Sequence, residues 1–103
     1  MVNQARVVLV ACGGGIASSH VVKNRIKDRL EAYGIENVII KAIPYLKAQI
    51  LSREAVLYVN LSPNDGINYA CPVMSGIPFL TGFGIEAAME ELKAHLEHHP
   101  PKA

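Results

Sequence analysis

The chain has little of what marks a secreted, membrane-embedded or nucleic-acid-binding protein. Only two cysteines occur, and no basic N-terminal region is followed by a long apolar run, so we expect a reduced, cytoplasmic protein without disulfides. The longest apolar stretch, Val7 to Cys12, is far shorter than the roughly 20 residues of a membrane-spanning helix, which predicts no direct membrane insertion. Ten basic and nine acidic side chains are scattered and nearly cancel, so nucleic acid is not an expected ligand.

What the sequence does have is the composition of a globular domain. Hydrophobic residues make up 50% of its 103 positions and charged residues 18%. A chain near this length buries roughly 60 to 70% of the surface that it exposes when unfolded, and therefore folds without disulfide bonds or a structural metal. We expect one domain over residues 1–103, with a core over about 5–97 and a C-terminal tail over 98–103.

Four apolar segments read as strands, and three amphipathic segments read as helices. The strands are expected at 5–11, 37–42, 55–61 and 73–74. The helices are expected from about 18 to 33, over a short segment after Pro44, and from about 85 until the Pro100-Pro101 pair ends the last one. Their inward-facing residues are expected to be Val22, Ile26, Leu30 and Tyr33 in the first, Leu46 and Ile50 in the second, and Ile85, Met89, Leu92 and Leu96 in the third. Residues 76–82 read as an apolar connection punctuated by glycine.

The alternation of strands and helices indicates an α/β fold. We predict a three-layer, doubly wound, four-stranded parallel sheet of order 2-1-3-4, with helices on both faces. In such sheets, ligands bind at the carboxyl ends of the strands where the strand order reverses, here between the first and third strands. The loops over residues 12–19 and 62–66 are expected to meet there.

The first of these loops joins a nucleophile to a potential anion site. Cys12 ends the first strand, and Gly13, Gly14 and Gly15 let successive backbone N–H groups converge on one anion. A helix that starts nearby adds unpaired N–H groups and a partial positive charge, which favour a phosphate and a thiolate alike. Cys12 is therefore a candidate acceptor of a phosphoryl group. The alternative is that the glycines form only a tight turn and that Cys12 is a small buried side chain of the core. The spacing alone does not decide between a phosphoryl acceptor and a structural cysteine.

Other phosphate-binding patterns fit this loop less well. No Gly-Lys-Ser/Thr follows, and Ser18 stands where a dinucleotide-binding loop needs its last glycine. Low-molecular-weight tyrosine phosphatases carry a cysteine, five residues, an arginine and then a hydroxyl. Ser18 occupies the place of that arginine, whose contacts to the transferring phosphoryl group matter greatly for hydrolysis. A thiophosphate that waits for an acceptor is therefore the better expectation.

Two segments of the chain resemble a known family. The first is Ala11-Cys12-Gly13-Gly14-Gly15-Ile16-Ala17-Ser18-Ser19, and the second is Gly76-Ile77-Pro78-Phe79-Leu80-Thr81-Gly82-Phe83-Gly84-Ile85-Glu86. Both are similar to the enzyme IIB component of the bacterial phosphoenolpyruvate-dependent sugar phosphotransferase system (PTS), in its galactitol-type branch. With the matching order of elements, the resemblance covers about residues 5–97.

The resemblance implies a phosphotransferase that works as a transient carrier. Cys12 would accept a phosphoryl group from a phosphohistidine of the IIA partner and pass it to a sugar or polyol, galactitol being one candidate, at the membrane IIC partner. Residues Gly13, Gly14, Gly15, Ile16, Ala17, Ser18 and Ser19 would form the phosphate-binding loop, chiefly through backbone N–H groups. No cofactor or metal is implied, and a monomer that docks transiently is expected.

Several other residues have side chains that could take part in catalysis or binding, but a structural or solvent-exposed role explains each of them as well. His20 could be a cation beside the phosphate, but an exposed first-turn histidine is favoured. Cys71 could be a resolving thiol for Cys12, but a structural cysteine is favoured. His95 and His99 have a spacing that can hold a metal, but solvated helix-end histidines are the safer interpretation. Asp65 could act as an acid or base, but a turn residue is favoured.

The apolar segment 77–83 is expected to pack mainly under the sheet. Any of its side chains that are exposed near Cys12 would form a docking patch for partner proteins. Two other functions remain open from the residues alone: a phosphatase or arsenate reductase on the same fold, and a non-catalytic regulatory module that binds phosphate or a partner.

Overall fold

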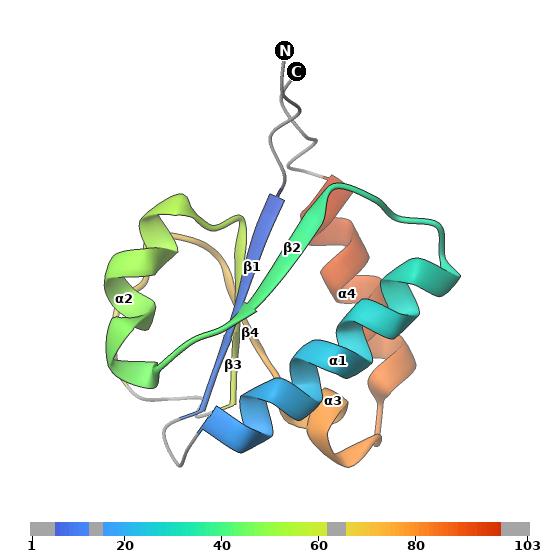
Figure 1. Ribbon diagram of the computed structural model, residues 1–103, viewed down its shortest axis with the longest axis horizontal. Coiled ribbons are helices and arrows are strands. Elements are labelled where there is room, and N and C mark those ends of the chain that lie inside the picture. Colours follow the sequence, from blue (N-terminus) through green and yellow to red (C-terminus); the bar gives the residue numbers. More distant parts are fainter. Residues whose placement is uncertain (1–5, 13–15, 62–65, 98–103) are drawn as a thin grey trace.

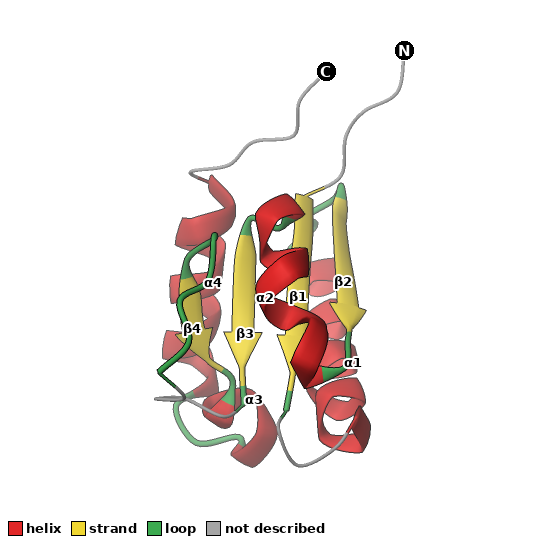
Figure 2. Cartoon of the chain, turned by 90° about the vertical axis from the view of Figure 1, so that its left-hand side faces the viewer, coloured by secondary structure: helices red, strands yellow, loops and turns green. Residues whose placement is uncertain are grey.

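The structure, a computed structural model, describes residues 6–12, 16–61 and 66–97. A four-stranded parallel sheet of order β2-β1-β3-β4 forms its centre (Figure 1). The strands are β1 (Arg6–Ala11), β2 (Val38–Ala42), β3 (Leu57–Asn60) and β4 (Val73–Ser75). The predicted fold class and strand order are confirmed, since helices cover both faces of this sheet (Figure 2).

The helices divide unequally between the two faces. α1 (Ile16–Ala32), α3 (Ile77–Thr81) and α4 (Ile85–Glu97) lie on one face, and the short segment η1 (Tyr45–Lys47), α2 (Ala48–Leu51) and η2 (Ser52–Glu54) lies on the other (Figures 1 and 2). Successive residues of a strand point to opposite faces, so β1 supplies Val8 and Val10 to a core on the α1 side and Leu9 and Ala11 to a core on the α2 side. This is why β1 reads as an unbroken apolar run.

The first helix packs largely as its spacing predicts. Val22, Ile26 and Leu30 are buried in the α1-side core, and Gly34 follows the helix with a φ of 73°, a left-handed conformation that suits glycine. The prediction that Tyr33 faces inward is wrong, because this residue lies beyond the last helical residue and is half-exposed. α4 buries Met89, Leu92 and Leu96 as predicted.

The prediction for the segment after Pro44 is wrong about which side chains face the core. Leu46 and Ile50 are exposed, at 92% and 63%, and the contacts with the α2-side core come from Tyr45, Ala48 and Leu51. Those three residues are spaced by three because the segment starts as a 3₁₀ helix, which has 3.0 residues per turn. A helical repeat of 3.6 residues therefore selects the wrong face.

The glycine-punctuated connection contains a helix that the sequence did not predict. α3 spans only five residues, with Pro78 in its first turn, and ends at Gly82, whose φ is 87°. Arg25 of α1 holds it in place, donating hydrogen bonds to the carbonyl oxygens of Phe79 (2.7 Å) and Leu80 (2.8 Å). Phe79 is fully buried in the α1-side core.

Gly76, between β4 and α3, has no room for a side chain. A Cβ atom there would lie 2.7 Å from Cδ2 of Leu61 and 2.9 Å from Cγ1 of Val59. We expect Gly76→Ala to lower the free energy of unfolding by about 1–3 kcal/mol through overpacking, measured by urea denaturation. In Leu61→Ala/Gly76→Ala, the loss should be smaller than the sum of the two single losses, and strict additivity would contradict the steric explanation.

Candidate functional site

Cys12 lies where the strand order predicts a site. It directly follows β1, and β1 and β3 meet at this end of the sheet: Ala11 pairs with Asn60, and the N–H of Leu61 donates to the carbonyl oxygen of Ala11 at 2.9 Å. The chain leaves β1 through α1 on one face and reaches β3 from α2 on the other, so the strand order reverses between them (Figure 2). The side chain of Cys12 is partly exposed and packs against the α1-side core.

α1 begins close to this cysteine. Its first residue is Ile16, two positions earlier than predicted, so Ser18 and Ser19 lie within the first helical turn. The first four N–H groups of a helix lack partners within it, and in a helix of 17 residues they carry the positive end of a sizeable dipole. Ser18 is partly exposed and Ser19 is fully buried. Gly13, Gly14 and Gly15 lie outside the described residues.

Asn60 is a polar residue of this edge that the sequence analysis missed. It ends β3, is 2% exposed, and accepts a hydrogen bond from the N–H of Gly76 on its backbone carbonyl at 2.9 Å. Its register with Ala11 places both side chains on the α2 side of the sheet, opposite to Cys12. The available signal was a single amide in the otherwise apolar run 55–61.

The second thiol is separate from the first. Cys71 is buried in the α2-side core, whereas Cys12 contacts the α1-side core, and no disulfide joins them. Burial raises the pKa of the Cys71 thiol from 9.0 to about 11. A buried thiol on the other face of the sheet fits the structural role favoured for it, not that of a resolving thiol.

The comparisons with known proteins agree on one family. The family model described as "PTS system, Lactose/Cellobiose specific IIB subunit" matches residues 7–91. The chain belongs to the PTS IIB family. Galactitol-specific EIIB components of Escherichia coli K12 and Shigella flexneri are each 27% identical to this IIB chain over 104 aligned residues, covering 89% of it and 97% of the relative. A putative phosphotransferase enzyme IIB component of E. coli K12 is 26% identical, covering 86% of this chain and 95% of that relative.

Membership confirms the resemblance and makes this IIB chain a phosphotransferase component of a sugar phosphotransferase system. No helix in the described ranges is long and apolar enough to span a membrane. The match covers both Cys12 and the described parts of the sheet edge around it.

The structure describes two of the remaining candidate residues of the IIB chain, His20 and His95. His20 is exposed in the first part of α1, as favoured. His95 lies 4.0 Å from the carboxylate of Glu91 on α4. Among the described residues, no group of three or more histidine, cysteine or acidic side chains could hold a metal. Asp65 and His99 lie outside the described residues.

The raised pKa of Cys71 makes the stability of this IIB chain depend on pH. The folded state keeps the thiol protonated between pH 9.0 and about 11, where the unfolded chain releases the proton. The stabilisation is therefore complete below pH 9.0 and falls as the pH rises toward about 11, by at most about 3 kcal/mol. Denaturation series across this range should show a smaller fall for Cys71→Ala than for the unmodified chain, and equal falls would contradict the assignment.

Proposed function

We propose that this chain is a cytoplasmic phosphocysteine carrier, with Cys12 as its catalytic residue. It accepts a phosphoryl group from the phosphohistidine of a IIA partner and delivers it to a sugar or polyol bound by a membrane IIC partner. The observation that carries the proposal is the placement of a partly exposed thiol between the end of β1 and the start of a 17-residue helix, at the point where the strand order reverses.

The proposed transfer has two balanced steps. The thiolate of Cys12 attacks phosphorus, forming an S–P bond as the P–N bond of the phosphohistidine breaks. The other ring nitrogen of the phosphohistidine carries a proton in this step, so the imidazole leaves as a neutral ring. A hydroxyl oxygen of the sugar then attacks the same phosphorus, the S–P bond breaks, and the thiolate is regenerated while the hydroxyl proton passes to a base in the acceptor site. Backbone N–H groups of residues 13–19 would stabilise the phosphoryl oxygens in both steps.

The acceptor we favour is a polyol of the galactitol type. Relatives that cover 89% of this chain are named as galactitol-specific EIIB components. The identity is 27%, and the sugar itself is bound by the IIC partner in this proposal, so the choice rests on the names of the relatives.

An exposed aromatic side chain on a fixed turn supports docking at this end of the molecule. Phe83 is 86% exposed and belongs to the segment between α3 and α4. That segment lies on the side of the carboxyl ends of the strands (Figures 1 and 2). The Thr81 hydroxyl donates to the carbonyl of Ile77 (3.1 Å) and accepts from the N–H of Phe83 (3.2 Å), and Arg25 anchors the preceding carbonyls. A rigid, exposed ring loses little entropy on binding, which favours an interface anchor.

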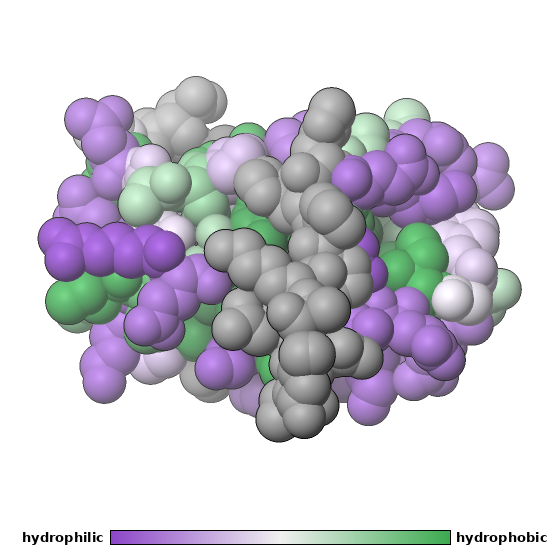
Figure 3. All heavy atoms as spheres, turned by 90° about the horizontal axis from the view of Figure 1, so that it is seen from above, coloured by the Kyte–Doolittle hydropathy of each residue, from purple (hydrophilic) through white to green (hydrophobic). Residues whose placement is uncertain are grey.

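The rest of this surface fits the same interpretation. Ile77 is 38% exposed, whereas Phe79 is buried, so the segment 77–83 divides between the core and a docking patch, as the sequence analysis allowed. The opposite end of the molecule shows mainly hydrophilic side chains outside its grey segments (Figure 3). A transient carrier needs a modest apolar patch through which it docks with its partners.

A reconstituted transfer assay tests the proposal. The chain is incubated with phosphoenolpyruvate that carries a labelled phosphoryl group, together with the general phosphotransfer proteins and a galactitol-type IIA. The amount of labelled phosphate on each protein is followed with time. Phosphate should pass from IIA to this chain and, with IIC-containing membranes and galactitol, on to the sugar. Release of inorganic phosphate without acceptor would favour a hydrolase, and no transfer from any IIA would favour a regulatory module.

Phe83→Ala is expected to weaken docking without unfolding the chain. The ring is almost fully exposed, so its loss should leave the free energy of unfolding within about 0.5 kcal/mol. As an interface anchor, its removal should raise the KM for phospho-IIA about tenfold or more in the transfer assay. Tyr33→Ala, a half-exposed aromatic at the end of α1, is the matched control and should leave KM unchanged. Equal effects of the two variants would refute the docking role.

A further inference from the structure

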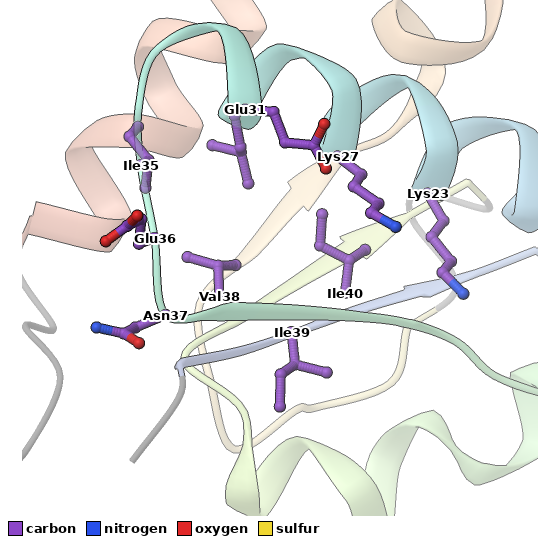
Figure 4. Close-up of a pocket in the computed structure, with 10 residues that line it drawn as sticks. Lys23, Lys27, Glu31, Ile35, Glu36, Asn37, Val38, Ile39 and Ile40 are labelled. Carbon is purple, nitrogen blue, oxygen red and sulfur yellow. The ribbon is translucent and has the colours of Figure 1, made fainter. Parts of the chain in front are cut away.

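A groove of about 430 Å³ lies along the outer edge of the sheet, between β2 and α1 (Figure 4), and Cys12 is not among the residues that line it. β2 is an edge strand, with β1 as its neighbour on one side. Val38 and Ile40 point from β2 toward α1 and form the floor of the groove, whereas Ile39 points to the other face of the sheet (Figure 4). Ile39 is 46% exposed.

The outer edge of β2 has no neighbouring strand within the described part of the chain. The N–H of Arg6 donates to the carbonyl of Asn37 at 2.8 Å, and the N–H of Ile43 donates to the carbonyl of Val10 at 3.0 Å. Because backbone direction alternates along a parallel strand, residues 37, 39, 41 and 43 face β1. The N–H and C=O groups of Val38, Ile40 and Ala42 therefore point outward, where another strand can pair with them.

The charges along the groove are segregated. Lys23 and Lys27 lie toward the carboxyl half of β2, and Glu31 and Glu36 lie toward its amino end (Figure 4). None of these four takes part in an ion pair within the described part of the chain. A second groove with the same charges, turned antiparallel to this one, would place its acidic end against the basic end of this groove. Its basic end would then lie against the acidic end of this groove.

We propose that the occupant of this edge is a second copy of the same chain. The two β2 strands would pair antiparallel about a two-fold axis at Ile39 and join the sheets into one of eight strands. In that register, Val38 of each copy faces Ile40 of the other, so the outward backbone groups of both residues are paired. Ile39 faces its own counterpart as a non-hydrogen-bonded pair, with Cα atoms about 4.5 Å apart, and the two exposed side chains cover each other.

The same axis also matches the charges. From Lys27 to Glu31, α1 advances about 6 Å, close to the length of two strand residues. Lys27 lies toward the Ile40 side of the groove and Glu31 toward its Val38 side (Figure 4). The operation that exchanges Val38 with Ile40 would therefore bring Lys27 of one copy toward Glu31 of the other. Two such pairs form by symmetry, so one register satisfies the backbone, the apolar side chain and the charges together.

The dimer would leave the phosphotransfer sites open. Antiparallel pairing sends the carboxyl ends of the two sheets in opposite directions, so the two Cys12 residues lie at opposite ends of the assembly. The interface therefore does not depend on the proposed carrier function, and it differs from the monomer that the sequence led us to expect. One edge strand buries an area at the low end of specific interfaces, which suggests a Kd on the order of 10⁻⁴ M.

Sedimentation equilibrium of the full chain, from about 10 µM to about 1 mM to bracket that Kd, tests the proposal. Lys27→Glu and Glu31→Lys should each raise Kd at least about tenfold, because each sets like charges against each other. The double variant Lys27→Glu/Glu31→Lys restores the complementarity and should return Kd to within about threefold. Ile39→Glu should abolish the dimer, whereas Ile50→Glu, on the exposed side of α2, should not.

The four substituted positions, 27, 31, 39 and 50, are all exposed, so the variants should remain folded. Circular dichroism checks that they do. The transfer assay on Ile39→Glu separates the two proposals, since phosphate acceptance should be unchanged if the dimer is lost. A chain that stays monomeric at 1 mM, whether or not this edge captures another protein, overturns the proposal. A dimer whose Kd is the same in the single and double charge variants also overturns the proposal, because such a dimer would use another surface.

Discussion

Cys12→Ser should lower the rate of phosphoryl transfer from phospho-IIA by at least about 1,000-fold. A serine hydroxyl has nearly the same size as the thiol but ionises far less readily, and no neighbouring general base is part of the proposed step. Of the two thiols, that of Cys12 is partly exposed, whereas that of Cys71 is buried. The measurement is the initial rate of label transfer at fixed concentrations of phospho-IIA.

The matched control for that experiment is Cys71→Ala. Cys71 is buried on the other side of the sheet, so its removal should cost stability but leave the transfer rate within about twofold at temperatures where the chain is folded. If Cys12→Ser still accepts phosphate at a comparable rate, or if Cys71→Ala abolishes acceptance, the assignment of the nucleophile is wrong.

The two thiols should also differ by at least about 100-fold in their rate of alkylation by iodoacetamide at pH 7. Only thiolates react at an appreciable rate, and a thiol whose pKa is about 11 is ionised in about one molecule in 10,000 at that pH. Cys71 is also 8% exposed, whereas Cys12 is partly exposed beside the start of a helix. Peptide mapping after timed labelling measures both rates in one sample.

A free thiol peptide in the same solution provides the reference rate. Cys12 should react faster than this reference if backbone N–H groups at the helix start hold an anion there, as the proposed function requires. Labelling no faster than the reference would mean that the thiolate is not activated. Equal labelling of Cys12 and Cys71 in the folded chain would contradict the placement of Cys71 in the core.

The sheet and its order could be predicted from the sequence because the buried strands are nearly pure apolar runs. Val8 to Ala11 lie between two layers of helices, so no polar face interrupts the pattern. The position of Cys12 followed from the strand order alone, since parallel strands that reverse order leave a site at their carboxyl ends. The α1 positions Val22, Ile26 and Leu30 followed from an ordinary helical repeat.

The sequence was less informative where segments are short. α3 has only five residues, with Pro78 inside it and glycine at both ends, so its helical state depends on contacts such as the Arg25 hydrogen bonds. Leu46 and Ile50 were placed on the wrong face because a 3₁₀ turn changes the repeat. The burial of Asn60 depends on strand register, which local sequence does not specify.

The site of phosphorylation is the most direct test of the proposed mechanism. The chain is phosphorylated by a cognate phospho-IIA at neutral pH, digested under mild conditions and mapped by tandem mass spectrometry. We expect a single phosphoryl group on the sulfur of Cys12. Phosphate on another residue, such as the exposed His20 nearby in α1, or a chain that carries none, would contradict a phosphocysteine carrier.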